Sequence, residues 1–183
     1  MSARAPSFDS HAFKRALGRF PTGVTVVTAA DSSGQPVGLT VSSFNSVSLN
    51  PPLVVWSLKR SSHSLATFER CERYAIQVLA SDQLDLAVRF ATRSPDERFD
   101  GQSLTTCPSG TPRLDCGVAA WFECFNRHHY TEGDHIVLIG EVEHCEHSDR
   151  LPLIYHGGGY ALTPSEASLA ASSQQTVTDL LIK

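Results

Sequence analysis

The sequence predicts a mainly β protein with flanking helices, folded as an antiparallel barrel, and three features of the chain support this. Short β-rich stretches follow one another through brief connections rich in Gly, Pro, Asn and Asp. Helical periodicity is confined to a few segments, too few to supply the crossover helix that each parallel connection needs. The sequence Gly-x-Gly-x-x-Gly follows none of the strands, which argues against a Rossmann dinucleotide domain.

Length and composition narrow the class of protein further. A chain of 183 residues with 41% apolar composition predicts one domain over 1–183, with a core from about 8 to 160. The formal charge of -4 provides no basic stripe, so nucleic acid is not expected as a partner. The chain has no signal-peptide pattern and no apolar run of ~20 residues, so we expect a cytoplasmic protein without a membrane segment.

The N-terminal segment is predicted to form a helix. Apolar side chains recur at helical spacing from Phe8 to Phe20, behind Asp9 and Ser10 as potential caps. The sequence Pro21-Thr22-Gly23 then ends the pattern.

The remaining elements follow from alternation, turn residues and caps. The expected strands are Val24 to Ala30, Pro36 to Leu49, Leu53 to Leu58, Tyr74 to Leu79, Ala119 to Arg127 and His135 to His144. The first two strands form a hairpin through the turn at 31–34, and the last two are joined by a polar connection ending in Gly133-Asp134. The expected helices run from Ser61 or Ser62 to about Arg70, and from Ser81 to Ala91.

Two segments show no periodicity. Thr92 to Arg113 carries charges, glycines and prolines, and is interpreted as a covering loop. The tail at 163–183 is rich in Ser and Ala, and is either a flexible end or an arm packed on a partner subunit. The five cysteines are odd in number and form no Cys-x-x-Cys pair, so we expect free thiols, with Cys124 packed as a small hydrophobe.

The stretch from Gly38 to Ser48 is the first candidate for a binding site. If it is one strand, Thr40, Ser42, Ser46 and Ser48 share a face and form a row of hydroxyls. Such a face matches the carbonyls and ring nitrogens of an isoalloxazine, although the same alternation is found in any strand with one solvated face.

A second candidate is the segment from Ser57 to Ser64, which carries two cations and several hydroxyls. If a helix begins there, its N-terminus together with Lys59 or Arg60 favours a phosphate. The alternative is an ordinary capped helix with solvated basic residues.

Histidines provide the last candidates. His135 follows Gly133-Asp134 at the mouth of a strand, where it contacts a nicotinamide or has a structural role. His144, Cys145 and His147 are residue types that bind zinc, but neighbours on a strand point to opposite faces, so no metal site is expected.

Taken together, these segments resemble the flavin reductase-like family with the FMN-binding split barrel, whose members are the reductase components of two-component flavin-dependent monooxygenases. Each matching piece is short, but the set in this order is specific. The pieces are FKRALGRFPTGVTVVT from Phe13, GLTVSSFNSVSLNPPLV from Gly38, SLKRSSHS from Ser57, YAIQVLASDQLDLAVRFA from Tyr74, GDHIVLIGEVE from Gly133 and PLIYHGGGY from Pro152.

The resemblance implies a site and a partner. By similarity, His135 lies beside the nicotinamide of NADH or NADPH, and FMN, or FAD, is bound by Thr40, Val41, Ser42, Ser43, Ser57, Lys59, Ser61, Ser62, Arg89 and Phe90. It also implies a homodimer with flavin sites near the subunit interface, and delivery of reduced flavin to a monooxygenase. Related chains often carry an arginine where this chain has Gly157 to Tyr160, so a cofactor contact from that position is in doubt.

Other functions remain open at this point. The same fold would suit an FMN-bound reductase of another acceptor, such as a corrinoid. A flavin-binding electron carrier without nicotinamide turnover, or a zinc-binding interaction protein, would also fit parts of the sequence.

Overall fold

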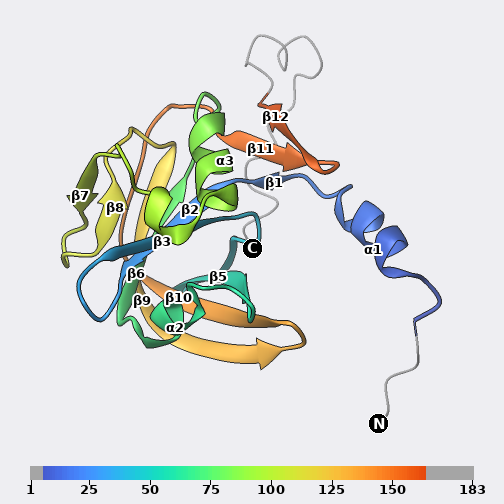
Figure 1. Ribbon diagram of the computed structural model, residues 1–183, viewed down its shortest axis with the longest axis horizontal. Coiled ribbons are helices and arrows are strands. Elements are labelled where there is room, and N and C mark those ends of the chain that lie inside the picture. Colours follow the sequence, from blue (N-terminus) through green and yellow to red (C-terminus); the bar gives the residue numbers. More distant parts are fainter. Residues whose placement is uncertain (1–5, 164–183) are drawn as a thin grey trace.

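A seven-stranded antiparallel sheet forms the body of the protein in the computed structural model, which describes residues 6–163 (Figure 1). Its strand order is β3-β2-β6-β9-β10-β5-β4, and smaller sheets of order β1-β11-β12 and β7-β8 accompany it. The strands are β1 (Thr22–Gly23), β2 (Thr25–Ala30), β3 (Pro36–Val41), β4 (Asn45–Leu49), β5 (Pro52–Lys59), β6 (Arg73–Val78), β7 (Leu104–Thr106), β8 (Pro112–Leu114), β9 (Ala120–Glu132), β10 (His135–His147), β11 (Leu153–His156) and β12 (Gly159–Leu162). The helices are α1 (Ser10–Leu17), α2 (Leu65–Arg70), α3 (Leu84–Thr92) and the 3-10 turn η1 (Pro95–Glu97).

The large sheet is rolled into a split barrel. β3 and β4 are its two edges, yet only Ser42, Ser43 and Phe44 separate them in the chain. Because each residue spans at most ~3.6 Å, this short link brings the two edges close together. The link itself is hydrogen-bonded to β5: the Ser43 hydroxyl accepts from the Ser57 backbone N–H at 2.9 Å and donates to the Ser57 carbonyl at 3.2 Å. The prediction of a mainly β, antiparallel barrel is confirmed.

The same link corrects one predicted strand. The stretch 36–49 is not one strand, because the chain leaves β3 after Val41 and re-forms on the opposite edge at Asn45. Ser46 and Ser48 therefore lie on β4, away from Thr40, and the predicted row of hydroxyls does not form.

Buried and more exposed side chains alternate along β5, so one face of the strand packs into the core and the other faces outward. Val54, Trp56 and Leu58 are buried, whereas Lys59 is exposed. The Trp56 ring packs edge-on against Phe68 and Tyr74, with centroids 5.0 and 5.6 Å away. A slip of one residue would expose this cluster, so the packing fixes the register of β5.

Two helices differ from their predicted starts. α2 begins at Leu65 rather than after Ser61 or Ser62, because two turns intervene: Ser62 N–H donates to the Lys59 carbonyl and Leu65 N–H to that of Ser62. α3 begins after Gln83 rather than Ser81. α1 begins as predicted, with the Asp9 carboxylate accepting from Ala12 N–H at 2.7 Å.

The segment 92–113 is not a structureless loop, since it contains η1, β7 and part of β8. Gln77, fully buried on β6, fixes β8 by donating to the Leu114 carbonyl at 2.9 Å and accepting from its N–H at 2.8 Å. Strands of three residues are too short to produce a recognisable hydrophobic period.

The polar connection predicted before Gly133 is also part of a strand. The turn between β9 and β10 is only Gly133-Asp134, with a positive φ of 59° at Gly133.

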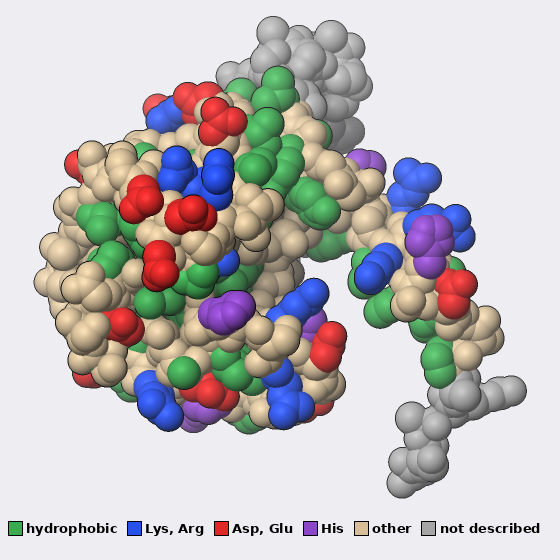
Figure 2. All heavy atoms as spheres, in the orientation of Figure 1, with side chains coloured by type: hydrophobic (Ala, Val, Ile, Leu, Met, Phe, Trp, Pro, Cys, Tyr) green, Lys and Arg blue, Asp and Glu red, His purple; other side chains and the backbone are tan. Residues whose placement is uncertain are grey.

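Helix α1 projects away from the barrel, and hydrophobic side chains are visible along it (Figures 1 and 2). None of its residues is buried, and Leu17 is 57% exposed.

The five cysteines are free and Cys124 is fully buried, as predicted. The tail beyond residue 163 lies outside the described residues. Among the described helices, none is both long and apolar enough to span a membrane.

Candidate functional site

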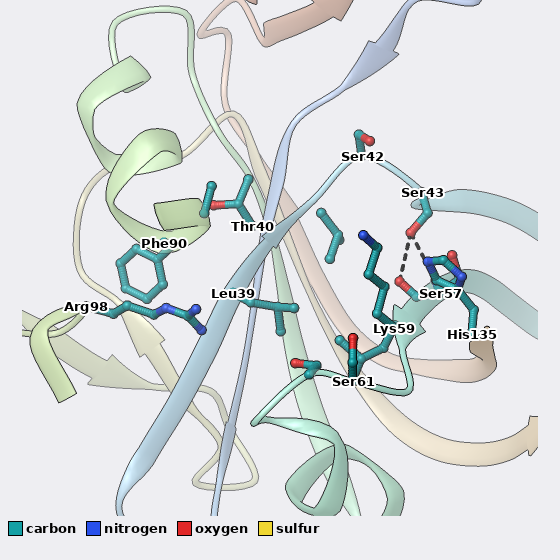
Figure 3. A pocket seen from close by; sticks show the side chains of 14 residues that line it. Leu39, Thr40, Ser42, Ser43, Ser57, Lys59, Ser61, Phe90, Arg98 and His135 are labelled. Carbon is teal, nitrogen blue, oxygen red and sulfur yellow. Dashed lines mark hydrogen bonds between the residues drawn. The ribbon is translucent and has the colours of Figure 1, made fainter. Parts of the chain in front are cut away.

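A cleft of about 480 Å³ opens where the barrel is split (Figure 3), within the usual range for small-molecule sites. Its walls come from β3, β5, the turn after β5, the end of α3 and the start of β10. The lining residues are Leu39, Thr40, Val41, Ser42, Ser43, Ser57, Leu58, Lys59, Ser61, Ser62, Phe90, Ala91, Arg98 and His135.

Every predicted site residue except Arg89 is in this lining. Arg89 instead donates through Nη1 to the carbonyls of Glu97 at 2.9 Å and Asp100 at 3.3 Å. Successive helix residues point about 100° apart, so Phe90 faces the cleft while Arg89 does not. Arg60 is also absent from the lining, whereas Lys59 is present.

The hydroxyls of the cleft fall into two groups. Thr40 donates to the Ala87 carbonyl at 2.7 Å, which ties β3 to α3, and Ser43 is engaged with the Ser57 backbone. These two hydroxyls therefore hold the walls together. Ser62 accepts from the Ser64 N–H at 3.2 Å. The hydroxyls of Ser42, Ser57 and Ser61 form no hydrogen bond within residues 6–163, which leaves them available to a ligand.

The charges of the cleft favour an anion. Lys59 and Arg98 line it as cations, and no Asp or Glu of the described chain does. His135 lies opposite Lys59 in the β10–β5 register. Its Nδ1 donates to the Asp134 carboxylate at 2.7 Å, and this hydrogen bond lowers the pKa of Asp134. The ring nitrogen Nε2 of His135 is thus the one left for a ligand.

Arg98 is the charged cleft residue that sequence reasoning missed, along with the apolar lining residues Leu39, Leu58 and Ala91. It follows η1, and Figure 3 shows its side chain entering from the α3 side beside Phe90 and Leu39. Because the segment around it has no periodicity, no local pattern indicates where its side chain points.

A smaller hollow of about 200 Å³ adjoins the cleft and shares Thr40, Val41, Ser42 and Ala91 with it. Tyr155 and Tyr160 form its other wall, with ring centroids 5.4 Å apart. The β11–β12 hairpin, which lacks the arginine expected there, therefore presents aromatic rings at this end of the cleft.

The His144-Cys145-Glu146-His147 stretch lies at the end of β10. Within residues 6–163, no group of three or more His, Cys, Asp or Glu side chains is arranged to hold a metal ion. Nε2 of His144 lies 4.0 Å from Oε2 of Glu123.

An antiparallel split barrel with an anion-favouring cleft at the split defines a recognisable class of protein, and comparison of the sequence identifies it. Residues 17–163 match the family described as Flavin reductase like domain. The chain belongs to this family.

Individual relatives agree with the assignment. The chain is 42% identical to the FMN reductase (NADH) SmoA of Agrobacterium fabrum, over 83% of this chain and 85% of that protein. It is 38% identical to the reductase component of a flavin-dependent trigonelline monooxygenase of Acinetobacter baylyi, covering 88% of this chain but only 51% of that protein. Among solved structures, the NADH:FAD oxidoreductase SgcE6 of Streptomyces globisporus, in complex with NAD and FAD fragments, superposes with a TM-score of 0.81 at 32% identity, over 91% of this chain and 99% of that one.

Proposed function

We propose that this chain is an NAD(P)H-dependent flavin reductase that supplies reduced FMN or FAD to a partner monooxygenase. The cleft at the barrel split carries the proposal, because it combines unengaged hydroxyls with cations and has no acidic lining residue in the described chain. These are the groups that a phosphorylated, hydrogen-bonding ring system requires. The sequence relatives named for flavin reduction support the same activity.

Each wall of the cleft has a proposed task. Backbone groups from Thr40 to Ser43 and the Ser42 hydroxyl hydrogen-bond the flavin ring, and Phe90 closes its side. Lys59, Ser61 and Ser62 hold the flavin phosphate, with Ser57 beside them. Flavin held by these residues would supply the redox chemistry, as an acceptor of hydride from a nicotinamide. The chain's own contribution is to align the two rings and exclude alternative poses.

Anaerobic mixing tests the activity. The protein is combined with FMN, FAD or riboflavin and then with NADH or NADPH, while the flavin absorbance is followed. We expect bleaching over many turnovers with at least one phosphorylated flavin. Tight flavin binding without turnover would favour an electron carrier, and reduction only when a corrinoid is added would favour the alternative acceptor.

His135 is proposed to contact the nicotinamide. Replacing His135 with alanine is expected to raise the nicotinamide KM about tenfold, because one hydrogen bond of ~1.4 kcal/mol is lost. The flavin Kd should change little. His129→Ala, an exposed histidine of the same hairpin, is the control. An unchanged KM in His135→Ala would remove this residue from the site.

We also propose a cytoplasmic homodimer of single-domain subunits. The free cysteines suit a reducing compartment. Helix α1 supports the dimer, because a helix of eight residues is marginal in water unless its apolar face is packed, and none of its residues is buried against the described part of the chain.

The dimer has a direct test. Leu17→Gln is expected to weaken self-association at least about tenfold, since burying a leucine contributes ~1.5–3 kcal/mol. Lys14→Gln on the same helix should leave association unchanged. Sedimentation equilibrium measures both. A wild-type protein that stays monomeric at all accessible concentrations would leave α1 to another partner and contradict the dimer.

A further inference from the structure

We propose that Arg98 is a phosphate-binding residue, acting with Lys59 on the phosphate of the flavin nucleotide. The inference rests on the flavin reductase function proposed above. Arg98 reaches the cleft from the α3 side and Lys59 reaches it from β5 (Figure 3). An anion in the cleft is therefore approached by a cation from each of two walls.

The guanidinium of Arg98 is held in one direction by the protein. Its Nε donates to the Arg93 carbonyl at 3.0 Å and its Nη1 donates to the Gly38 carbonyl at 2.7 Å. Its Nη2 has no hydrogen-bond partner among residues 6–163. Because the guanidinium is planar and rigid, two fixed nitrogens also fix the third. The residue thus offers oriented donors that the protein itself does not use.

The charge of Arg98 also lacks a counter-ion in the described chain. Both of its partners are backbone carbonyls, and none of the ion pairs within residues 6–163 includes it. The neighbouring Glu97 carboxylate instead accepts from the Ser94 hydroxyl at 2.8 Å. Partial burial lowers the pKa of Arg98, with desolvation as the cause. A desolvated cation is costly unless an anion compensates it, and a bound phosphate would supply that anion.

The packing around Gly38 explains how Arg98 reaches this position. A Cβ at Gly38 would lie 3.0 Å from Phe99 Cζ and 3.1 Å from Phe90 Cε1. The absence of a side chain allows the Phe90–Phe99 pair, with centroids 5.0 Å apart, to lie directly on β3. Arg98, adjacent to Phe99, is thereby placed over the Gly38 carbonyl.

A purely structural role is the competing explanation, and Arg89 provides a matched comparison. Arg89 holds the same segment through the carbonyls of Glu97 and Asp100, but its side chain lies outside the cleft. If Arg98 only anchors the segment around Glu97, substitution of either arginine should change the affinity for all flavins by the same factor. If Arg98 binds phosphate, its substitution should affect phosphorylated flavins alone.

Equilibrium titration of FMN and riboflavin with the full chain separates these cases. We expect Arg98→Gln to raise the Kd of FMN about tenfold and that of riboflavin less than about twofold, a single charge-assisted contact being lost. Arg98→Lys should recover part of the FMN affinity. Arg89→Gln should not change the ratio of the two Kd values. The retained riboflavin affinity also reports that each variant is folded.

Two results would overturn the assignment of Arg98. One is an equal loss of FMN and riboflavin affinity in Arg98→Gln, and the other is an unchanged FMN affinity. A phosphate-selective loss in Arg89→Gln as large as that in Arg98→Gln would also count against it. If the wild-type chain binds neither flavin, the proposed function itself fails, which is distinct from a wild-type chain that binds FMN and an Arg98 variant that binds it equally well.

Discussion

Replacing Trp56 with alanine is expected to lower the free energy of unfolding by about 3–5 kcal/mol. The Trp56 side chain is fully buried in a hydrophobic core cluster and packs edge-on against two other buried rings. Removing it loses apolar burial and leaves a cavity that Phe68 and Tyr74, both fully buried, cannot readily fill. Since proteins are stable by only ~5–15 kcal/mol, this is a large part of the total.

Urea unfolding followed by circular dichroism measures the effect. Leu49→Ala is the control, because Leu49 is 74% exposed on the edge strand β4 and its truncation should change the unfolding free energy by less than ~0.5 kcal/mol. A loss below ~1 kcal/mol in Trp56→Ala would mean that the cluster repacks and that β5 is not held as described.

Local sequence patterns were sufficient to predict the elements whose conformation does not depend on distant parts of the chain. Asp9 and the apolar spacing behind it predicted α1, and the buried run from Leu53 to Leu58 predicted β5 almost to its ends. The turn at Asp31 was also predicted, and its carboxylate accepts from the backbone N–H of Ser33 and Gln35. In these cases the residues that determine the conformation are neighbours in the chain.

Features that depend on closure of the barrel were not predictable in this way. The chain passes from one edge of the sheet to the other at Ser42 and Ser43, yet hydroxyl residues continue to alternate there. Residue type alone does not indicate which strand a segment pairs with, so the break could not be predicted. The start of α2 was misplaced since Ser61 and Ser62 suit a turn as well as a cap.

The candidate site also contains residues that local sequence patterns predicted and one that depends on tertiary structure. The order of short motifs indicated Lys59, Ser42 and His135, and the structure brings all three to one cleft. Arg98 was missed because its position depends on a tertiary contact with the Gly38 carbonyl, 60 residues earlier in the chain. Its direction follows from packing over β3 and from no local pattern.

Replacing Lys59 with glutamine is expected to raise the Kd of FMN by about 10- to 100-fold, because charge-assisted hydrogen bonds contribute ~1.5–3 kcal/mol. The Kd of riboflavin, which lacks the phosphate, should stay nearly constant. Arg60→Gln is the matched control, since Arg60 is the next residue but lies outside the cleft lining. Fluorescence titration of both flavins measures all of these values, and added salt should weaken FMN binding more in the wild type than in Lys59→Gln.

The combination of Lys59→Gln with Arg98→Gln gives the sharper result. If both side chains contact one phosphate, each single variant leaves the other cation to bind it alone, so the two losses should not add. Strict additivity of the two losses in FMN affinity would mean that the two cations act on FMN independently and do not share its phosphate. Equal losses for riboflavin and FMN in Lys59→Gln would instead show that β5 had been disturbed, and the phosphate would have to be placed elsewhere in the cleft.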